Sequence, residues 1–169
     1  MKTAHALDYH SNSGEGEEQH LTFSLAGEEY GIPILKVQEI RSWDKVTPIP
    51  NSPPYVRGVL NLRGLIVPIM DLRLRFNLPE VEYTPVTAIV VVHVAGRMAG
   101  LVVDAVSDVT TIGAGKHCAP PEYEGQKERE FIKGLAQIEG KLLILLDIDR
   151  IVGHEVLDKA LTPGQREPS

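Results

Sequence analysis

Residues 57–76 read RGVLNLRGLIVPIMDLRLRF. Gly58 and Gly64 bracket the alternating stretch VLNL, and the apolar run that follows ends at Asp71. The pattern is typical of two strands joined by a tight turn, because glycine supplies the positive φ that such turns require. A loop that cradles phosphate or carries catalysis is the alternative. A catalytic or phosphate-binding loop should occur once in the chain. A structural framework built from repeats should show the pattern more than once.

The pattern occurs twice. IKGLAQIEGKLLILLDI at 132–148 aligns without a gap on VRGVLNLRGLIVPIMDL at 56–72. Upstream, GIPILKVQEI at 31–40 aligns on GLVVDAVSDV at 100–109 in the same order. The positions shared by the longer pair of segments are Gly58 with Gly134, Gly64 with Gly140, and Asp71 with Asp147. The chain is therefore built from two halves that follow one plan.

These shared glycines and aspartates are assigned to the framework, because no catalytic partner is common to both copies. Gly64 and Gly140 are predicted to provide the positive φ of hairpin turns. Asp71 and Asp147 are predicted to cap the turn or short helix that follows each buried strand. Since each half is small, we expect the two to share apolar surface in one cooperative unit.

The remaining pattern favours strands. Leu21, Phe23 and Leu25 alternate with polar residues, and TPIPNSPPY at 47–55 carries four prolines that cannot complete a ladder. The one helix expected lies at 153–161, and polar tails are expected at 1–18 and 157–169. Short strands separated by turns indicate an all-β fold of small barrels or a sandwich.

Composition excludes several classes of function. A net charge of −6 and a pI near 5.5 argue against a nucleic-acid partner. The single cysteine, Cys118, cannot close an intrachain disulfide. No apolar run approaches the roughly 20 residues of a membrane span, and the start lacks a secretory signal. We therefore expect a cytoplasmic protein without direct membrane insertion.

The sequence offers no convincing catalytic group. IGAGKH at 112–117 lacks the first glycine and the final Ser or Thr of a phosphate-binding loop. His117 and Cys118 are adjacent and have no second cysteine pair, so a metal site is not expected. Asp104 and Asp108 could work as an acid and base, but their spacing is more typical of a solvated turn. We predict no catalytic residue, metal or cofactor.

The places where the two halves differ hold more information about function. Arg63 in the first half stands where the second half has Glu139. Glu39 and Arg41 lie close to apolar residues of the aligned upstream segment. Two interpretations of Arg63 remain open. It is either a surface arginine paired with a nearby carboxylate, worth about 0–1 kcal/mol, or the anchor of a binding surface.

Together, EEYGIPILKVQEIR, VRGVLNLRGLIVPIMDLRLRF and GLVVDAVSDV resemble the CheW family of bacterial chemotaxis coupling proteins, from Gln19 to Val156. The resemblance implies two small five-stranded β-barrels of SH3-like type about a shared core. It places the folded domain at 19–156, with the first barrel at about 19–82 and the second at about 83–156. Strand exchange between the barrels is compatible with this division.

The resemblance also implies a non-enzymatic adaptor that couples transmembrane chemoreceptors to the histidine kinase CheA. The expected partners are the cytoplasmic tip of a chemoreceptor, the regulatory domain of CheA and other CheW-like domains in an array. Such a protein is cytoplasmic and is recruited to the receptor array. The alternatives are a CheW-like scaffold of a non-motility chemosensory array and, in a different class, a small β-barrel hydrolase.

Carried over position by position, the resemblance assigns five residues to the receptor groove or its support: Val37, Glu39, Ile40, Arg63 and Val106. Val106 enters as the repeat partner of Val37 on the second barrel. Tyr123 falls where the family has an aromatic residue that contacts the kinase or a neighbouring barrel. Gly58 matches a position where bulk is poorly tolerated.

Overall fold

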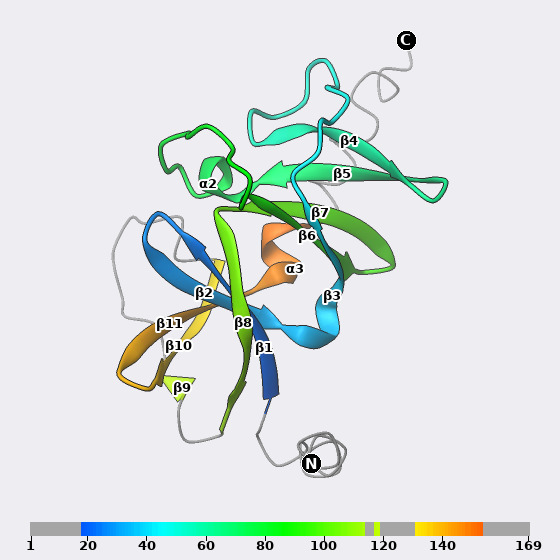
Figure 1. Ribbon diagram of the computed structural model, residues 1–169. Helices are drawn as coiled ribbons and strands as arrows, with labels where there is room; N and C mark the ends of the chain where they lie inside the picture. The colour runs from blue at the N-terminus through cyan, green and yellow to red at the C-terminus, as the bar shows by residue number, and fades with distance from the viewer. Residues whose placement is uncertain (1–17, 114–116, 119–130, 154–169) are drawn as a thin grey trace.

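The computed structural model describes residues 18–113, 117–118 and 131–153, and most of their regular structure is β-strand (Figure 1). The strands are β1 (Glu18–Leu25), β2 (Glu28–Pro33), β3 (Val37–Ser42), β4 (Val56–Leu62), β5 (Leu65–Asp71), β6 (Ala88–Val94), β7 (Arg97–Val103), β8 (Ala105–Ile112), β9 (His117–Cys118), β10 (Ile132–Ile138) and β11 (Lys141–Leu146). The short helices are η2 (Ile34–Lys36), α2 (Leu72–Arg75) and α3 (Ile148–Ile151). The predicted all-β class is confirmed.

The strands form two sheets with the same plan. Sheet A has the order β8-β1-β2-β11-β10-β9, and sheet B has the order β3-β6-β7-β5-β4. Each sheet contains antiparallel hairpins joined by one parallel pair, which is β2 with β11 in sheet A and β5 with β7 in sheet B. Apart from the two-residue strand β9, the sheets therefore match strand for strand, as the sequence repeat requires.

The two halves of the chain exchange their first hairpins (Figure 1). The β1–β2 hairpin lies in sheet A with strands of the second half, and the β6–β7 hairpin lies in sheet B with strands of the first half. The expected division between 82 and 83 therefore separates the repeats but does not separate the sheets. The physical reason is the parallel pairing, which joins each hairpin to a strand from the other repeat.

Glycine permits this parallel pairing. Gly100 lies opposite Ile69 in the β5–β7 pair, and a Cβ atom there would lie 2.6 Å from the Cδ1 atom of Ile69. Its repeat counterpart Gly31 lies opposite Leu145, where a Cβ would lie 3.3 Å from Cδ2 of Leu143. The aligned glycines thus lie at matching positions of the two parallel pairs, where a side chain would crowd the strand of the other repeat.

The predicted turn residues have the backbone that a two-residue hairpin requires. Arg63 and Gly64 have φ of 52° and 91°, and Glu139 and Gly140 have φ of 51° and 80°. Positive φ at both central residues is the type I′ geometry, whose twist matches that of the flanking strands. In this way the sequence places Arg63 and Glu139 at corresponding exposed tips of the two sheets.

Both predicted caps precede a short helix. The Asp71 carboxylate accepts hydrogen bonds from the backbone N–H of Arg73 at 2.8 Å and of Leu74 at 3.3 Å. The Asp147 carboxylate accepts one from the backbone N–H of Arg150 at 3.3 Å. These contacts satisfy amide groups that the first turn of a helix leaves without partners.

Among the described residues, buried apolar side chains form three clusters, one of which joins the two sheets. The shared core lies between the sheets and includes Phe23, Leu101 and Ile151, all fully buried. A second core lies within sheet B, around residues that include Ile69, and a third lies within sheet A, around residues that include Leu145. The sheets therefore fold as one unit around the shared core, since strands of both repeats contribute to it.

The expectation of two closed five-stranded barrels needs correction. Sheet A has a sixth, two-residue strand, and among the described residues no ladder joins β3 to β4 or β8 to β9. The segment between β3 and β4 contributes a single bridge, with Thr47 N–H donating to Val59 O and Val59 N–H donating to Thr47 O. The prolines of 47–55 explain the gap, because proline has no amide donor for a ladder.

Some expectations lie outside the described residues. These are the helix at 153–161 beyond its first residue, the tail at 157–169, and the tail at 1–18 except Glu18, which begins β1.

Candidate functional site

A β-bulge determines which side of β3 each candidate residue faces. The register between β3 and β6 shifts at Gln38, between Val37 and Glu39. The β6 residues opposite Val37 and Ile40 belong to the shared core, whereas Val91, opposite Glu39, belongs to the core within sheet B. Because opposed residues of an antiparallel pair share a face, Val37 and Ile40 face the shared core. Glu39 faces the interior of sheet B.

The second repeat has the same bulge at the matching place. The register between β1 and β8 skips Ser107, so that Val106 lies opposite Phe23 and Asp108 lies opposite Thr22. Val106 and Val109 lie opposite residues of the shared core. The two strands thus place their apolar candidates at the edges of one core. Val109 was omitted from the sequence-based site, although the alignment that puts Ile40 on Val109 contained the signal.

We call Val37, Ile40, Val106 and Val109 the β3/β8 apolar set. Val37 and Val106 are partly buried against the shared core. Ile40 is 46% exposed and Val109 is 45% exposed, which is high for side chains of this size. Leu35, in η2 directly before β3, is almost fully exposed. The set combines an anchored inner pair with an outer pair open to a partner.

The charged candidates lie on the opposite face of β3. Arg63 Nη2 donates to Glu39 Oε1 at 2.5 Å, and Arg41 Nη1 donates to Glu39 Oε2 at 3.4 Å. The hydrogen bond from Arg63 is the main cause that lowers the pKa of the Glu39 carboxyl below its usual value. Of the two interpretations, the structure therefore shows Arg63 paired with a carboxylate. Its side chain nevertheless remains 65% exposed.

This pairing connects two elements that are distant in the sequence. Arg63 lies in the turn between β4 and β5, and Glu39 lies in β3, at the other edge of sheet B. The ion pair therefore bridges the two edge strands at a place where no backbone ladder joins them. Through its contact with Glu39, Arg63 lies on the face of β3 opposite to the one that carries Val37 and Ile40.

The two aspartates considered as an acid–base pair have different surroundings. Asp104 accepts hydrogen bonds from Arg73 Nε at 2.9 Å and Nη2 at 2.8 Å, and from Ala26 N–H at 2.9 Å. The Arg73 hydrogen bonds are the main cause that lowers the pKa of Asp104. Asp108 is exposed and accepts from the N–H of Val109. Asp104 thus joins the β1–β2 turn to α2 and serves the fold.

Of two further candidates, Gly58 and Tyr123, the structure describes only Gly58. Gly58 in β4 has φ 148° and lies against the backbone of Thr47, so its position requires glycine. Tyr123 lies outside the described residues. Across the described part of the chain, no three acidic, histidine or cysteine side chains gather as metal ligands. No helix in that part has the length and apolar character needed to cross a bilayer.

Comparison with known proteins connects this arrangement to a family. A family model described as the CheW-like domain matches residues 19–156. The chain is 44% identical over 138 residues to the chemotaxis protein CheW of Klebsiella aerogenes, covering 82% of this chain and 83% of that protein. The chain belongs to the CheW-like family. The family resemblance predicted from the sequence is confirmed.

Two other CheW proteins agree. The chemotaxis protein CheW of Bacillus subtilis is 33% identical over 144 residues, covering 85% of this chain and 92% of that protein. The crystal structure of the scaffolding protein TtCheW from Thermoanaerobacter tengcongensis superposes with a TM-score of 0.75 at 31% identity, covering 82% of this chain and 94% of that one. The chain is thus a chemotaxis scaffold of the CheW type. The CheW family is in general not catalytic.

Proposed function

We propose that the chain is the cytoplasmic adaptor that couples transmembrane chemoreceptors to the histidine kinase CheA. The proposal rests on the CheW-like family and on one observation, the β3/β8 apolar set. Ile40 and Val109 expose apolar surface at matching edges of the shared core, where it is available to a partner. An adaptor has such a surface because its partner covers it.

The receptor is expected to dock on this apolar set. Val37 and Val106 are held by the shared core and cannot move far, so the surface around them is preformed. A helical receptor tip can place an apolar stripe against such a surface, which is the helix-in-groove mode of recognition. A single contact between the receptor and this surface is expected to be weak, and the overall binding becomes stronger when many copies act together in an array.

Arg63 is expected to act mainly through Glu39. Its hydrogen bond holds the β4–β5 turn against β3, from the side opposite Ile40. Loss of the ion pair should therefore loosen β3 and weaken receptor binding indirectly. The exposed part of the Arg63 guanidinium remains able to meet a carboxylate on a partner.

The regulatory domain of CheA and other CheW-like domains are expected at the tips of the two sheets. Arg63 and Glu139 occupy corresponding turns and carry opposite charges. Contact between unlike tips of two such domains is therefore favoured over contact between like tips. Tyr123 remains a candidate for these contacts through the family resemblance.

Co-sedimentation with membranes that contain a chemoreceptor, in the presence of CheA, tests the proposal. Ile40→Asp and Val109→Asp should each weaken receptor association at least tenfold, because a carboxylate would have to be buried against the receptor. Val86→Asp is the matched control, since Val86 is 65% exposed in the loop before β6, outside the apolar set. Equal loss in all three variants would contradict the proposed surface.

A charge exchange tests the supporting role of Arg63. The single variants Arg63→Glu and Glu39→Arg should both reduce receptor association and kinase activation. The double variant restores the attraction between positions 39 and 63 with reversed polarity but loses the contact between Glu39 and Arg41, so it should recover part of the activity if Arg63 acts through Glu39. A double variant as defective as Arg63→Glu would show instead that Arg63 meets a partner directly.

A further inference from the structure

The described chain passes from one sheet to the other at two places, and each lies directly before a strand of the β3/β8 apolar set (Figure 1). The first crossing is η2, which leads from β2 of sheet A to β3 of sheet B. The second is Asp104, which leads from β7 of sheet B to β8 of sheet A. Val37 follows η2 directly, and Val106 follows Asp104 closely. The crossings therefore determine where the two apolar strands begin.

Each crossing is held by the short helix of the other repeat. Arg73 in α2 donates to Asp104 from Nε at 2.9 Å and from Nη2 at 2.8 Å. Lys36 in η2 donates from Nζ to the carboxylate of Asp149 in α3 at 3.2 Å. Arg73 and Asp149 occupy the same place in the repeat, although their charges are opposite. Two different pairs of side chains thus make the same connection between the repeats.

β3 and β8 depend on these connections because both are edge strands. Among the described strands, β3 pairs only with β6 and β8 pairs only with β1. Each of these two ladders is also interrupted by a bulge, at Gln38 in β3 and at Ser107 in β8. The backbone ladder alone therefore gives the first residues of each strand less support than a central strand receives.

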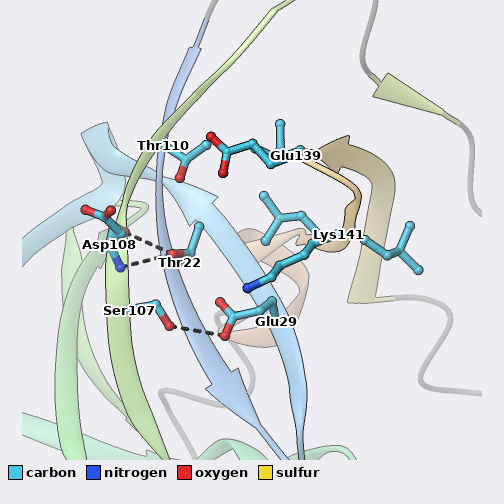
Figure 2. Close-up of a pocket in the computed structure, with 10 residues that line it drawn as sticks. Thr22, Glu29, Ser107, Asp108, Thr110, Glu139 and Lys141 are labelled. Atoms are coloured by element: carbon cyan, nitrogen blue, oxygen red, sulfur yellow. Dashed lines mark hydrogen bonds between the residues drawn. The ribbon is translucent and has the colours of Figure 1, made fainter.

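β8 is fixed on both sides of Val106. Before Val106, Asp104 is held by Arg73, and their side chains are only 28% and 15% exposed. After Val106, Thr22 bridges the bulge, because its Oγ1 donates to the carbonyl oxygen of Asp108 and accepts from the N–H of Asp108, both at 3.1 Å (Figure 2). Val106 therefore has little freedom to move along or away from sheet A.

β3 is held less firmly at its beginning. The side chains of Lys36 and Asp149 are 38% and 62% exposed. An exposed ion pair contributes little to stability, whereas an arginine that donates two hydrogen bonds to one carboxylate forms a stronger and more directional contact. We therefore expect loss of Arg73 to displace β8 more than loss of Asp149 displaces β3.

We propose that Arg73 and Asp149 are positioning residues, which set the placement of β3 relative to β8 for receptor recognition. Each acts through the crossing residue that it holds, Asp104 or Lys36. The inference rests on the proposed function, because it takes the β3/β8 apolar set as the receptor surface. It adds that the ion pairs of α2 and α3, together with the shared core, determine how far apart the two strands lie.

A distance measurement between the two strands tests the positioning without the receptor. Spin labels are attached to the full-length protein at Gln38→Cys and Ser107→Cys, both exposed positions, with Cys118→Ser to remove the native thiol. Pulsed electron paramagnetic resonance then gives the distribution of distances between β3 and β8. Arg73→Met should broaden this distribution, and Asp149→Ala should broaden it less.

Two further variants complete the comparison. Arg150→Met is the matched control, since Arg150 pairs with Asp147 at 3.6 Å within one repeat and at neither crossing; it should leave the distribution unchanged. Arg73→Lys keeps the charge but cannot form the planar two-bond contact, so it should give an intermediate width. If Arg73→Met unfolds, Arg73→Lys and Asp149→Ala provide the same comparison. An unchanged distribution in the folded Arg73 and Asp149 variants, or equal broadening in Arg150→Met, would overturn the proposal.

An exchange of charges separates positioning from direct contact with a partner. Lys36→Asp places two carboxylates at the first crossing and should weaken receptor association about threefold. Adding Asp149→Lys restores the ion pair with reversed polarity and should recover most of the receptor association and the narrow distance distribution. A double variant as defective as Lys36→Asp would overturn the proposal, because Lys36 would then meet a partner directly.

Co-sedimentation with receptor-containing membranes connects the distances to function. Arg73→Met should weaken receptor association about three- to tenfold. Unchanged association in Arg73→Met, in an assay where Ile40→Asp and Val109→Asp weaken it, would overturn the positioning role alone. Unchanged association in Ile40→Asp and Val109→Asp would overturn the proposed function and this inference with it.

Discussion

Replacing Gly58 by alanine is expected to destabilise the protein strongly, and the structure specifies why. Gly58 has φ 148°, a region that residues with a side chain rarely adopt. A Cβ atom added there would lie 2.3 Å from the carbonyl oxygen of Thr47 and 2.7 Å from its carbonyl carbon. Both obstacles are backbone atoms, so no side-chain rotation can relieve the overlap.

The expected cost has two parts. An alanine held at this φ has about 2 kcal/mol of backbone strain. To make room, the Thr47 backbone must move away from β4, which would break its two hydrogen bonds with Val59, at 3.0 and 2.9 Å. Each bond contributes about 1 kcal/mol net. We therefore expect the free energy of unfolding to fall by about 4 kcal/mol, a large share of the stability of an ordinary domain.

Urea denaturation followed by circular dichroism measures this cost, with Gly64→Ala as the matched control. Gly64 also has positive φ, 91°, but a Cβ there would meet nothing within 4 Å. The control carries a smaller backbone strain, because its φ is nearer the left-handed helical region, and no overlap, so it should lose about 1 kcal/mol. A second control adds Val46→Ala to Gly58→Ala. It removes a 3.0 Å side-chain neighbour of the added Cβ and should not restore stability.

Equal losses of stability in Gly58→Ala and Gly64→Ala would refute the overlap at Gly58, because the contact with Thr47 would then contribute nothing. Rescue by Val46→Ala would refute it as well, since the obstacle would then be a side chain.

Three further outcomes are expected. Asp71→Ala should lower the free energy of unfolding by about 3 kcal/mol and Asp147→Ala by about 1 kcal/mol. The difference is expected because buried Asp71 also accepts a hydrogen bond from Tyr83. Equal losses in urea melts would contradict this. The pKa of Asp104 is lowered by Arg73, so its stabilising effect is complete above the unfolded pKa of about 3.9 and is lost as pH falls. The difference in the free energy of unfolding between wild type and Asp104→Asn should thus be constant from about pH 5 to 8 and should become smaller below about pH 4. A difference that grows in acid would contradict this prediction. A chain broken between residues 82 and 83 should give two fragments that are unfolded alone and fold when mixed, since each sheet needs strands from both repeats; a fragment with a cooperative melt of its own would disprove this.

Local chemistry made much of the framework predictable from the sequence. The turn at Gly64 and the cap at Asp71 depend on backbone geometry within three or four residues. Their recurrence at Gly140 and Asp147 showed that they belong to the framework. The repeat, the all-β class and the family could also be predicted, because each depends on the order of residues along the chain.

The pairing of strands and side chains that are distant in the sequence could not be predicted in this way. A bulge at Gln38 places Val37 and Ile40 on one face of β3 and Glu39 on the other, although the sequence spacing would put the first two on opposite faces. Arg63 could have been free or paired, and only the proximity of β3 to the β4–β5 turn decided that it pairs with Glu39.

The sequence by itself therefore determined the repeated elements, their turns and caps, and the family to which the chain belongs. Only the tertiary structure decided that the two repeats exchange hairpins, which side chains face the shared core, and that Arg63 pairs with Glu39. The physical reason is the distance along the sequence between the residues that determine each feature. Turns and caps are fixed by neighbours in the chain, whereas faces, ion pairs and pockets depend on which distant strands pair and in which register.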